Sequence, residues 1–453
     1  MRLARLVAPL VLVIGLLAPG HAAATGTPSH VEGVLPDGAG YVLDVPANWN
    51  RTVLLYSHGY VPQGGPNPAR NAPGDAERTA LLGQGYALIG SSYPDTGWIV
   101  ERALPDQLAT LDVFTARFGQ PRRTIAWGTS MGGMITTGLA ERAGHRFAGT
   151  LAMCGLEMGG VALWNNTLDP LFAIKTLLAP ASTRSLVRLP DQATALATRD
   201  ELTAALDAAQ ATPTGRARIA LAAALHNLPA WTDPSMPEPA PDDVDTAQRN
   251  QFQTLHGTIH VGLSWRQEAE TRAGGNMSWN IGVDYARILA RSADRPEVET
   301  LYARAGLSLA ADLDTLNRAP RITPDLRAVG YLIHNIVFTG RITKPMLTIH
   351  TTGDNLVPVQ AEAAYAETVH AAGRDTLLRQ AFVHRPGHCT FTTGEMLAAL
   401  RTLEQRINTG RWPSTAPATL NNLASTIDPT ATPAYITYHP APYPRPFDLA
   451  AHR

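Results

Sequence analysis

The sequence predicts an α/β fold in which a mostly parallel central sheet is covered by helices and a large helical insertion interrupts the chain. Short apolar runs alternate with segments of helical composition, which is the pattern of parallel strands buried on both faces. The alternation stops near residue 156 and resumes near residue 341, and the residues between them show helical periodicity broken by prolines. The sheet is therefore expected to be assembled from two separate segments of the chain.

The first segment carries most of the expected strands. Residues 53–57 (VLLYS) are apolar nearly throughout, as in a strand covered on both faces, and residues 106–118 have the composition of a helix. Strands are expected at 41–45, 53–57, 86–91, 123–127 and 147–153, and helices at 76–84, 106–118 and 131–143.

Further helices and strands are expected in the insertion and in the second segment of the core. Helical patterns within the insertion include 200–209, 215–226, 285–293 and 296–305. After the insertion, strands are expected at 346–350 and 377–383, and helices at 359–371 and 393–409. Alternation of this kind places the carboxyl ends of the parallel strands at one edge of the sheet, where loops can bring functional side chains together.

The expected domain organisation has five parts. They are a leader at 1–24, the first part of the α/β core at 25–155, the helical insertion at 156–340, the second part of the core at 341–410, and a Pro-rich extension at 411–453. The extension contains Tyr435, Tyr438, Tyr443 and Phe447, and these aromatic residues predict that it packs on the body of the protein.

The amino-acid composition limits the kinds of molecule that the protein is expected to bind. The chain has 453 residues, of which 45% are hydrophobic and 17% charged, as in an ordinary globular protein. A formal net charge of −1 and the absence of a basic cluster in the sequence argue against nucleic acid and anionic membrane surfaces as partners. A small, nearly neutral substrate is expected, and the oligomeric state stays open.

The first 24 residues have the pattern of a secretory signal peptide. Arg2 and Arg5 precede an apolar run at 6–17, and small residues end at Ala24, after which cleavage is expected. The alternative is a membrane anchor, but this run is shorter than the roughly 20 residues of a spanning helix. The sequence therefore predicts an exported protein, extracellular or periplasmic, that is free of the membrane after cleavage.

Ser130 lies between two glycines in the segment 128–132 (GTSMG), directly after an expected strand and before an expected helix. This is the pattern of a nucleophile on a sharp strand-to-helix turn. Side chains at positions 128 and 132 would collide with the neighbouring strand and helix, so glycine is required there for steric reasons. The segment predicts that Ser130 is a catalytic nucleophile.

A serine hydroxyl needs a base that takes its proton and a carboxylate that orients the base. Asp354 follows the expected strand 346–350 in a turn-forming loop, and His388 follows the expected strand 377–383. These residues are the candidates for the orienting acid and the base. His384 is an alternative base, and Glu157, which follows the strand next to Ser130, is an alternative acid.

With the chain order Ser, Asp, His, these motifs resemble those of the α/β-hydrolase family, and specifically of secreted serine esterases. The resemblance covers residues 41–156 and 346–409 and implies Ser130 as nucleophile, His388 as base and Asp354 as acid. The family carries a His-Gly-X segment after an early strand, and His58-Gly59-Tyr60 occupies that place here. The resemblance implies that the backbone N–H groups of Tyr60 and Met131 form the oxyanion hole, and that the insertion is a cap.

Two further similarities are partial. The segment 130–134 (SMGGM) is similar to the corresponding turn of acetyltransferases related to homoserine acyl transfer. His388-Cys389 is similar to the tannase and feruloyl esterase group, whose members carry a cysteine immediately before the nucleophile. Thr129 occupies that position here, which leaves an aromatic ester substrate open.

The two cysteines are expected to form a disulfide. Cys154 ends the expected strand beside Ser130, and Cys389 follows His388, so both are expected at the same edge of the sheet. Export permits the bond, and two separate buried thiols are the alternative. Trp98, in a loop just after another strand, is the tryptophan expected to touch substrate. The sequence shows no pattern of a metal or phosphate site, so no cofactor or metal is expected.

The leading functional hypothesis is an exported serine hydrolase that cleaves a carboxylic ester through an acyl-enzyme, with the insertion acting as a lid. Three alternatives stay open. They are a peptidase acting on small peptides, an acyltransferase, and a catalytically inactive binding module on the same fold.

Overall fold

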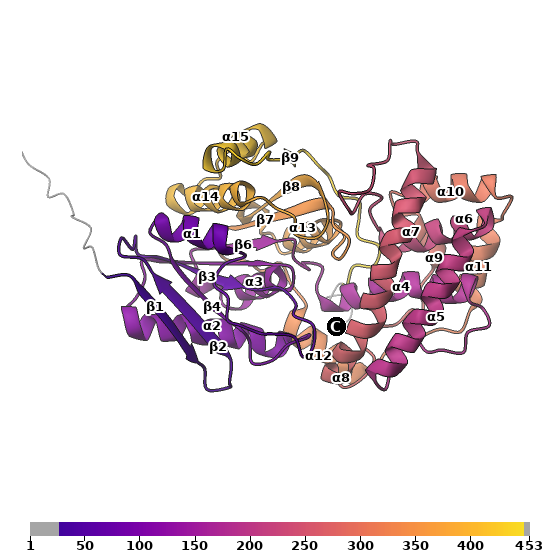
Figure 1. The fold of residues 1–453 in the computed structure, drawn as a ribbon, viewed down its shortest axis with the longest axis horizontal. Helices are drawn as coiled ribbons and strands as arrows, with labels where there is room; N and C mark the ends of the chain where they lie inside the picture. Colours follow the sequence, from indigo (N-terminus) through magenta and orange to yellow (C-terminus); the bar gives the residue numbers. More distant parts are fainter. Residues whose placement is uncertain (1–26, 448–453) are drawn as a thin grey trace, which may run out of the picture.

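The computed structural model describes residues 27–447, so the expected signal peptide lies outside the described residues. A sheet flanked by helices forms one side of the molecule, and a cluster of helices stands beside it (Figure 1). In chain order, the strands are β1 (Ser29–Val34), β2 (Gly40–Val45), β3 (Thr52–Ser57), β4 (Ala87–Ser91), β5 (Arg123–Thr129), β6 (Gly149–Met153), β7 (Met346–Gly353), β8 (Leu378–Pro386) and β9 (Tyr435–Ile436).

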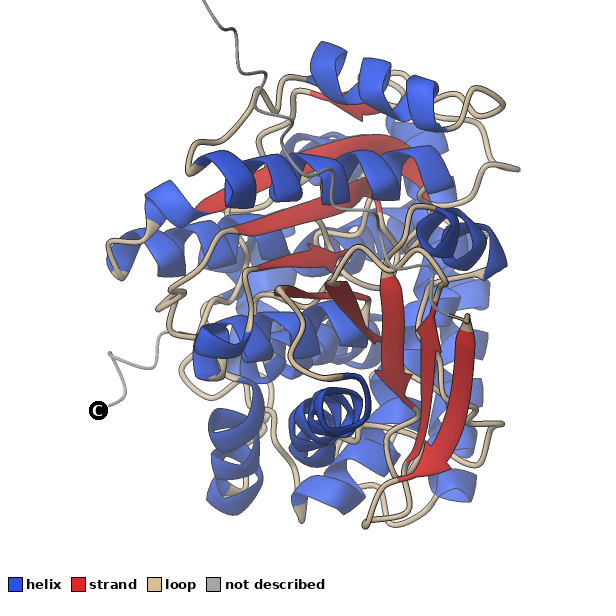
Figure 2. Cartoon of the chain, turned by 90° about the vertical axis from the view of Figure 1, so that its left-hand side faces the viewer, coloured by secondary structure: helices blue, strands red, loops and turns tan. Residues whose placement is uncertain are grey.

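The sheet is mostly parallel, as the sequence predicts. Its strand order is β1-β2-β4-β3-β5-β6-β7-β8-β9. The six strands from β4 to β8 in this order pair in parallel, whereas β1 and β2 at one edge and β9 at the other pair antiparallel. Figure 2 shows the strands twisting through the middle of this part, with helices on either side.

The two outermost strands, β1 and β9, were not among the strands expected from the sequence. Of the six residues of β1, only Val31 is buried, so the strand lacks the apolar run by which the central strands were recognised. The other edge strand, β9, has two residues, and Tyr435 pairs there with Val383 of β8. Edge strands bury little surface, so hydrophobic patterning marks them weakly.

Alternate residues of each central strand face separate apolar cores. In β3, Val53 and Leu55 belong to one core, whereas Leu54 and Tyr56 belong to the other. The first core lies under α2 (Val100–Phe118), α3 (Met131–Arg142) and α13 (Ala361–Ala371), and the second lies under α1 (Asp75–Gly83), α14 (Thr393–Thr409) and α15 (Pro417–Ile427). Short 3₁₀ turns occur at Gly144–Arg146 and Asp375–Leu377.

Three helices differ from expectation at their ends. Helix α2 begins at Val100, six residues before the expected start, and it contains Pro105 near its amino end. From the sequence, the helix is expected to begin only after this proline, because proline interrupts helices more often than it continues them. In the insertion, α5 (Gln192–Gln210) begins eight residues before the expected start. Helix α9 (Tyr285–Leu289) ends earlier than expected, and the chain turns before the next helix.

The residues between β6 and β7 form a cluster of helices with an apolar core of its own. Its elements are α4 (Gly160–Leu178), α5 (Gln192–Gln210), α6 (Pro213–His226), α7 (Val244–His260), the π-helical turn η2 (Val261–Trp265), α8 (Arg266–Ala273), α9 (Tyr285–Leu289), α10 (Arg295–Arg304), α11 (Leu309–Arg318) and α12 (Leu326–Ile336). Helix α12 leads back to the sheet and contacts α2 and α3. Within residues 27–447, none of the helices combines the length and apolar character needed to cross a bilayer.

The carboxyl-terminal segment connects the two parts of the molecule. Helix α15 packs on α14, and the chain then forms β9 at the edge of the sheet. Farther on, Tyr443 is buried, and the Arg445 guanidinium lies 3.0 Å from the Asp169 carboxylate of α4. Because this ion pair has little exposed surface, it ties the end of the described chain to the helical cluster.

Candidate active site

Ser130 occupies the turn between β5 and α3 with a left-handed backbone conformation, φ 57° and ψ −126°. Such a conformation is costly for a residue with a side chain and requires support from its surroundings. The N–H of Ser130 donates to the Met153 carbonyl at 3.0 Å, and its carbonyl accepts from the Met134 N–H at 3.2 Å. The turn is thereby held between the neighbouring strand β6 and the first turn of α3.

The two flanking glycines are required by close backbone packing. A Cβ atom on Gly128 would lie 2.4 Å from the Gly132 carbonyl oxygen, and one on Gly132 would lie 1.9 Å from the Ser57 carbonyl oxygen. No side chain fits at either position without moving the backbone. These distances confirm that glycine is required at positions 128 and 132 for steric reasons.

His388 links Ser130 to Asp354. The Ser130 hydroxyl lies 2.7 Å from Nε2 of His388, and Nδ1 of the same ring lies 2.7 Å from Oδ2 of Asp354. The structure therefore brings together the three residues that the sequence named as nucleophile, base and acid. The loop of His388 is fixed by the Thr351 hydroxyl, which donates to the Gly387 carbonyl at 2.8 Å.

Asp354 is fully buried, and hydrogen bonds satisfy both of its oxygens. Its Oδ1 accepts from the backbone N–H groups of Leu356 and Val357 at 2.9 and 2.8 Å, and its Oδ2 faces His388. Burial by itself would raise the pKa of Asp354, but the charges and hydrogen bonds of His388 and His350 hold it well below its usual range. Asp354 is therefore a carboxylate that can hold the His388 ring in one orientation.

The two alternatives considered from the sequence do not join this chain of contacts. Nε2 of His384 lies 3.0 Å from Glu238, and both side chains are more than two-fifths exposed. Glu157 is buried, but neither of its carboxylate oxygens has a hydrogen-bond partner among the described residues. In this arrangement His388 and Asp354, and not His384 and Glu157, connect to Ser130.

The groups expected to form the oxyanion hole lie beside Ser130. Met131 is the first residue of α3, and N–H groups in the first turn of a helix have no partner within the helix. Tyr60 follows Gly59, and a Cβ atom on that glycine would lie 3.2 Å from the Cβ of Ser130. His58 is held in place because its two ring nitrogens face the carbonyls of Gly59 and Ser92. The side chains of Tyr60 and Met131 both line the pocket that contains Ser130.

A mainly apolar pocket adjoins Ser130 and is lined by both the sheet and the insertion. Its lining residues are Tyr60, Trp98, Ser130, Met131, Leu156, Leu163, Trp164, Thr167, Val261, Trp265, Leu356 and Val357. The rings of Tyr60 and Trp265 are stacked at 4.3 Å, and those of Trp98 and Trp164 meet edge to face at 5.4 Å. The expectation that Trp98 lies at the site agrees with this lining, and Trp164 and Trp265 lie there although neither was expected to touch substrate.

The loop of Trp98 is attached to the insertion by a buried carboxylate. The backbone N–H of Trp98 donates to Glu268 of α8 at 2.8 Å, and Arg272 lies 3.0 Å from the same carboxylate. Arg272 also pairs with Asp95 and Glu101 of the core at 3.0 and 3.2 Å. One guanidinium therefore joins α8 to the two core segments on either side of Trp98.

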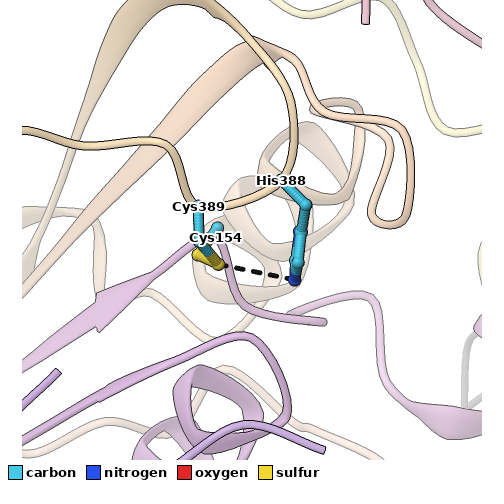
Figure 3. A group of neighbouring side chains, drawn as sticks. All are labelled: Cys154, His388 and Cys389. Atoms are coloured by element: carbon cyan, nitrogen blue, oxygen red, sulfur yellow. Dashed lines mark hydrogen bonds between the residues drawn. A yellow bond between two sulfur atoms is a disulfide. The ribbon is translucent and has the colours of Figure 1, made fainter. Parts of the chain in front are cut away.

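Cys154 and Cys389 form a disulfide, as the sequence analysis expected, with Cα atoms 5.4 Å apart. The bond joins the end of β6 to the residue after His388, and Sγ of Cys389 lies 3.4 Å from Nε2 of His388 (Figure 3). The sulfurs are bonded to each other, so they are not thiolate ligands. Elsewhere in the described residues, Glu157, His350 and Glu362 form a buried cluster that the sequence analysis did not anticipate.

No family model matches the chain. The chain is 32% identical over 421 residues to an o-phthalyl amidase of Xanthobacter agilis, and the match covers 86% of this chain and 90% of the amidase.

Solved structures of similar fold share far less sequence. An esterase of Pyrococcus furiosus is 12% identical, with 89% of this chain and 97% of that chain covered and a TM-score of 0.39. Feruloyl esterase B of Aspergillus oryzae is 11% identical, with 85% and 80% covered and a TM-score of 0.38. Family membership rests on the amidase, whose similarity extends over most of both sequences: the chain belongs to the family of the o-phthalyl amidase and is a hydrolase of the α/β-hydrolase fold.

Proposed function

We propose that this protein is an exported serine hydrolase that cleaves the carboxylic ester of a small aromatic acid through an acyl-enzyme. The observation that carries this proposal is the line of contacts from Ser130 through His388 to Asp354, with 2.7 Å at each step. These distances are those of direct proton transfer and of an oriented base.

In the proposed reaction, Oγ of Ser130 attacks the carbonyl carbon of the ester while Nε2 of His388 takes the hydroxyl proton. Asp354 stabilises the resulting imidazolium, and the N–H groups of Tyr60 and Met131 stabilise the negative oxygen of the tetrahedral intermediate. His388 then gives its proton to the departing alcohol, which leaves an acyl group on Ser130. A water molecule, deprotonated by His388, then attacks the acyl group on Ser130, so the carboxylic acid is released and the serine hydroxyl is restored.

The pocket favours a flat, apolar acyl group. Four of its lining side chains are aromatic, and none carries a formal charge. The indole N–H groups of Trp98 and Trp164 are buried and have no hydrogen-bond partner among the described residues. An acyl ring with an oxygen substituent would supply the acceptor that these donors lack. A peptidase that captures a free amine is less favoured, because no carboxylate lines the described pocket.

The insertion is proposed to act as a lid. The cavity in the structure measures about 50 Å³, well below the several hundred cubic ångströms typical of ligand sites. Part of its lining comes from α4 and η2 of the insertion, including Trp164 and Trp265. Displacement of these elements would enlarge the cavity, and their return over the substrate would exclude water.

Amide hydrolysis at the same site is the second candidate, because the relative with 32% identity is named as an amidase. In an amide the leaving group is an amine, which leaves less readily than an alcohol. Amide hydrolysis therefore depends more strongly on His388 as the acid that protonates the leaving group. Export is supported by the leader expected at residues 1–24 and by the disulfide, which forms in oxidising compartments. Amino-terminal sequencing of the protein recovered outside the cytoplasm tests the cleavage after Ala24.

The test of the proposed function is a substrate panel run with the parent protein and Ser130→Ala. The panel contains p-nitrophenyl acetate, butanoate, benzoate and 2-carboxybenzoate, together with the matching anilides. We expect turnover of the benzoate esters and loss of at least about 10⁴-fold in Ser130→Ala, because the nucleophile is missing while the turn can accept alanine. A fluorophosphonate probe should label the parent but not the variant. Parent-like turnover by Ser130→Ala would overturn the assignment.

A further inference from the structure

Behind the proposed acid lies a second histidine that the reaction scheme does not use. His350 of β7 is fully buried, and its Nε2 lies 3.5 Å from Oδ2 of Asp354, the oxygen that also faces His388. The same nitrogen lies 3.0 Å from the Val357 carbonyl. On the other side of the ring, Nδ1 lies 3.2 Å from Oε1 of Glu362, on α13. The ring is therefore placed between two carboxylates.

These contacts determine the charge of His350. Both ring nitrogens face oxygen acceptors, and a neutral imidazole would direct its lone pair at one of them. Although burial opposes the charged form, Asp354 and Glu362 raise the pKa of His350 well above its usual value. Glu362 in turn accepts from the Thr348 hydroxyl at 2.5 Å and from the Gln380 amide, so hydrogen bonds hold its carboxyl group in place against the His350 ring.

The remaining titratable groups around the ring are neutral or distant from its nitrogens. Burial and the negative charge of Glu362 raise the pKa of Glu157 to about 8, so this carboxyl is protonated at neutral pH. Tyr365 of α13 donates its hydroxyl to Glu141, and burial raises the pKa of this phenol well above its usual value. Asp354, His350 and Glu362 together then carry one excess negative charge.

We propose that His350 is a positioning residue for the hydrolytic reaction, a buried imidazolium that holds Asp354 as a carboxylate and lowers the proton affinity of the Asp354–His388 pair, on which the lower pH limit of activity depends. The one excess negative charge of the group matches the positive charge that His388 acquires when it takes the serine proton. Without His350, two carboxylates would face each other in a buried site, and one of them would bind a proton. Protonated Asp354 can no longer stabilise the imidazolium of His388.

The arrangement is costly for a purely structural contact. A buried ion pair between a strand and a helix stabilises a fold no better than well-packed apolar side chains do, because each charge loses its hydration. Thr348 and His350 point to the same side of β7, where α13 packs, and both use this interface to contact Glu362. Apart from the Val357 carbonyl, the polar contacts of the His350 ring are with Asp354 and Glu362, as a role in setting the charge of Asp354 requires.

The kinetic test uses His350→Gln, which keeps a hydrogen-bond donor but cannot carry charge. The acid limb of kcat/KM should move to higher pH by at least about one unit, because loss of a positive charge 3.5 Å from Oδ2 of Asp354 raises the proton affinity of the Asp354–His388 pair more than about tenfold. We expect kcat on the plateau to fall about tenfold and KM to change less than about threefold.

Two further variants distinguish the effect of losing the charge of His350 from the effect of changing the shape of a buried side chain. His226→Gln is the matched control, because His226 is also buried and burial lowers its pKa to about 4, so its removal deletes no charge. Its pH profile should match that of the parent. Glu362→Gln removes a negative charge, so its acid limb should stay in place or move to lower pH. An unshifted limb in His350→Gln, or equal upward shifts in His350→Gln and Glu362→Gln, would overturn the proposal.

A second measurement does not depend on folding of the variants or on turnover. In the intact parent protein labelled with ¹⁵N-histidine, a long-range ¹H–¹⁵N spectrum should show one buried ring that stays protonated at both nitrogens from pH 6 to pH 9. Titration of every histidine below pH 8 would refute a buried imidazolium. The kinetic test rests on the proposed function, whereas the spectrum does not, so failure of the hydrolase assignment and failure of this inference are distinguishable.

Discussion

Sγ of Cys389 lies 3.4 Å from Nε2 of His388, the ring nitrogen that faces the Ser130 hydroxyl. The disulfide therefore reaches directly to the proposed base. Both half-cystines have left-handed backbone conformations, with φ 44° at Cys154 and 56° at Cys389. Such conformations are unfavourable for residues with side chains, and the covalent bond helps to maintain them beside the catalytic loop.

Loss of the disulfide is expected to lower both stability and activity. In the double variant Cys154→Ser/Cys389→Ser, the bond between residues 235 apart in the sequence is missing, which costs about 5 kcal/mol in a chain-entropy model. The His388 loop should also relax, and kcat should fall about tenfold or more. Chemical denaturation and steady-state kinetics measure the two effects. Unchanged values of both would show that the loop is held by its other contacts alone.

The two histidines at the end of β8 should differ sharply on substitution. His388→Ala removes the group between Ser130 and Asp354 and should lower kcat by about 10⁴-fold or more. His384→Ala removes an exposed pair with Glu238, a contact worth at most about 1 kcal/mol, and should change kcat less than threefold. Steady-state kinetics on an activated ester checks both, and the reverse ranking would exchange the roles of the two residues.

The acid is tested by a matched pair of amide substitutions. Asp354→Asn should lower kcat by about 10⁴-fold, because the amide cannot stabilise the imidazolium and can hold the ring in the wrong tautomer. Glu157→Gln should lower kcat less than about tenfold, since this carboxyl does not contact His388. Circular dichroism confirms that both variants are folded. A severe loss in Glu157→Gln together with a mild one in Asp354→Asn would move the acid to the end of β6.

Glu157 should also make stability depend on pH. Its pKa is about 8 in the folded protein and near its ordinary 4.5 in the unfolded chain, so the unfolded state releases this proton first as pH rises. The stability that the protonated Glu157 side chain contributes to the folded protein is therefore lost progressively as the pH rises from about 4.5 to about 8. Glutamine does not ionise, so Glu157→Gln does not lose stability in this way. Its free energy of unfolding, compared with that of the parent protein, should therefore rise by about 2 to 4 kcal/mol from pH 5 to pH 8.5. Urea denaturation at the two pH values measures it, and parallel pH dependence in both proteins would contradict the shift.

The aromatic pocket predicts a change in substrate selectivity. Trp98→Leu removes a ring and an unpartnered indole N–H beside Ser130, and should lower kcat/KM for benzoate esters about tenfold relative to acetate esters. Trp412→Leu is the control, because Trp412 donates to the Thr376 carbonyl away from the pocket. Equal benzoate-to-acetate ratios in parent and Trp98→Leu would place the acyl group elsewhere.

Features set by local sequence were the ones that could be predicted. The turn at Ser130 requires glycines within two residues on either side, so its pattern is readable without knowledge of the fold. Asp354, His388 and Cys389 follow buried strands, and parallel strands end at one edge of a sheet, so their proximity followed from chain order. The same reasoning placed Cys154 near Cys389, although only the 5.4 Å between their Cα atoms decided that they pair.

Other features of the site could be seen only in the tertiary structure, because they depend on packing between segments that are distant in the sequence. Helical periodicity in the insertion indicates which residues are apolar, but it does not tell which of two apolar faces turns toward Ser130, so Trp164 and Trp265 could not be assigned to the pocket. The contact between His350 and Glu362 joins a strand to a helix and has no motif of its own. Sequence patterns thus determined the backbone positions of the site, whereas the lining of the pocket and the charges behind Asp354 were decided by how helices pack on the sheet, because packing depends on three-dimensional neighbours that periodicity does not specify.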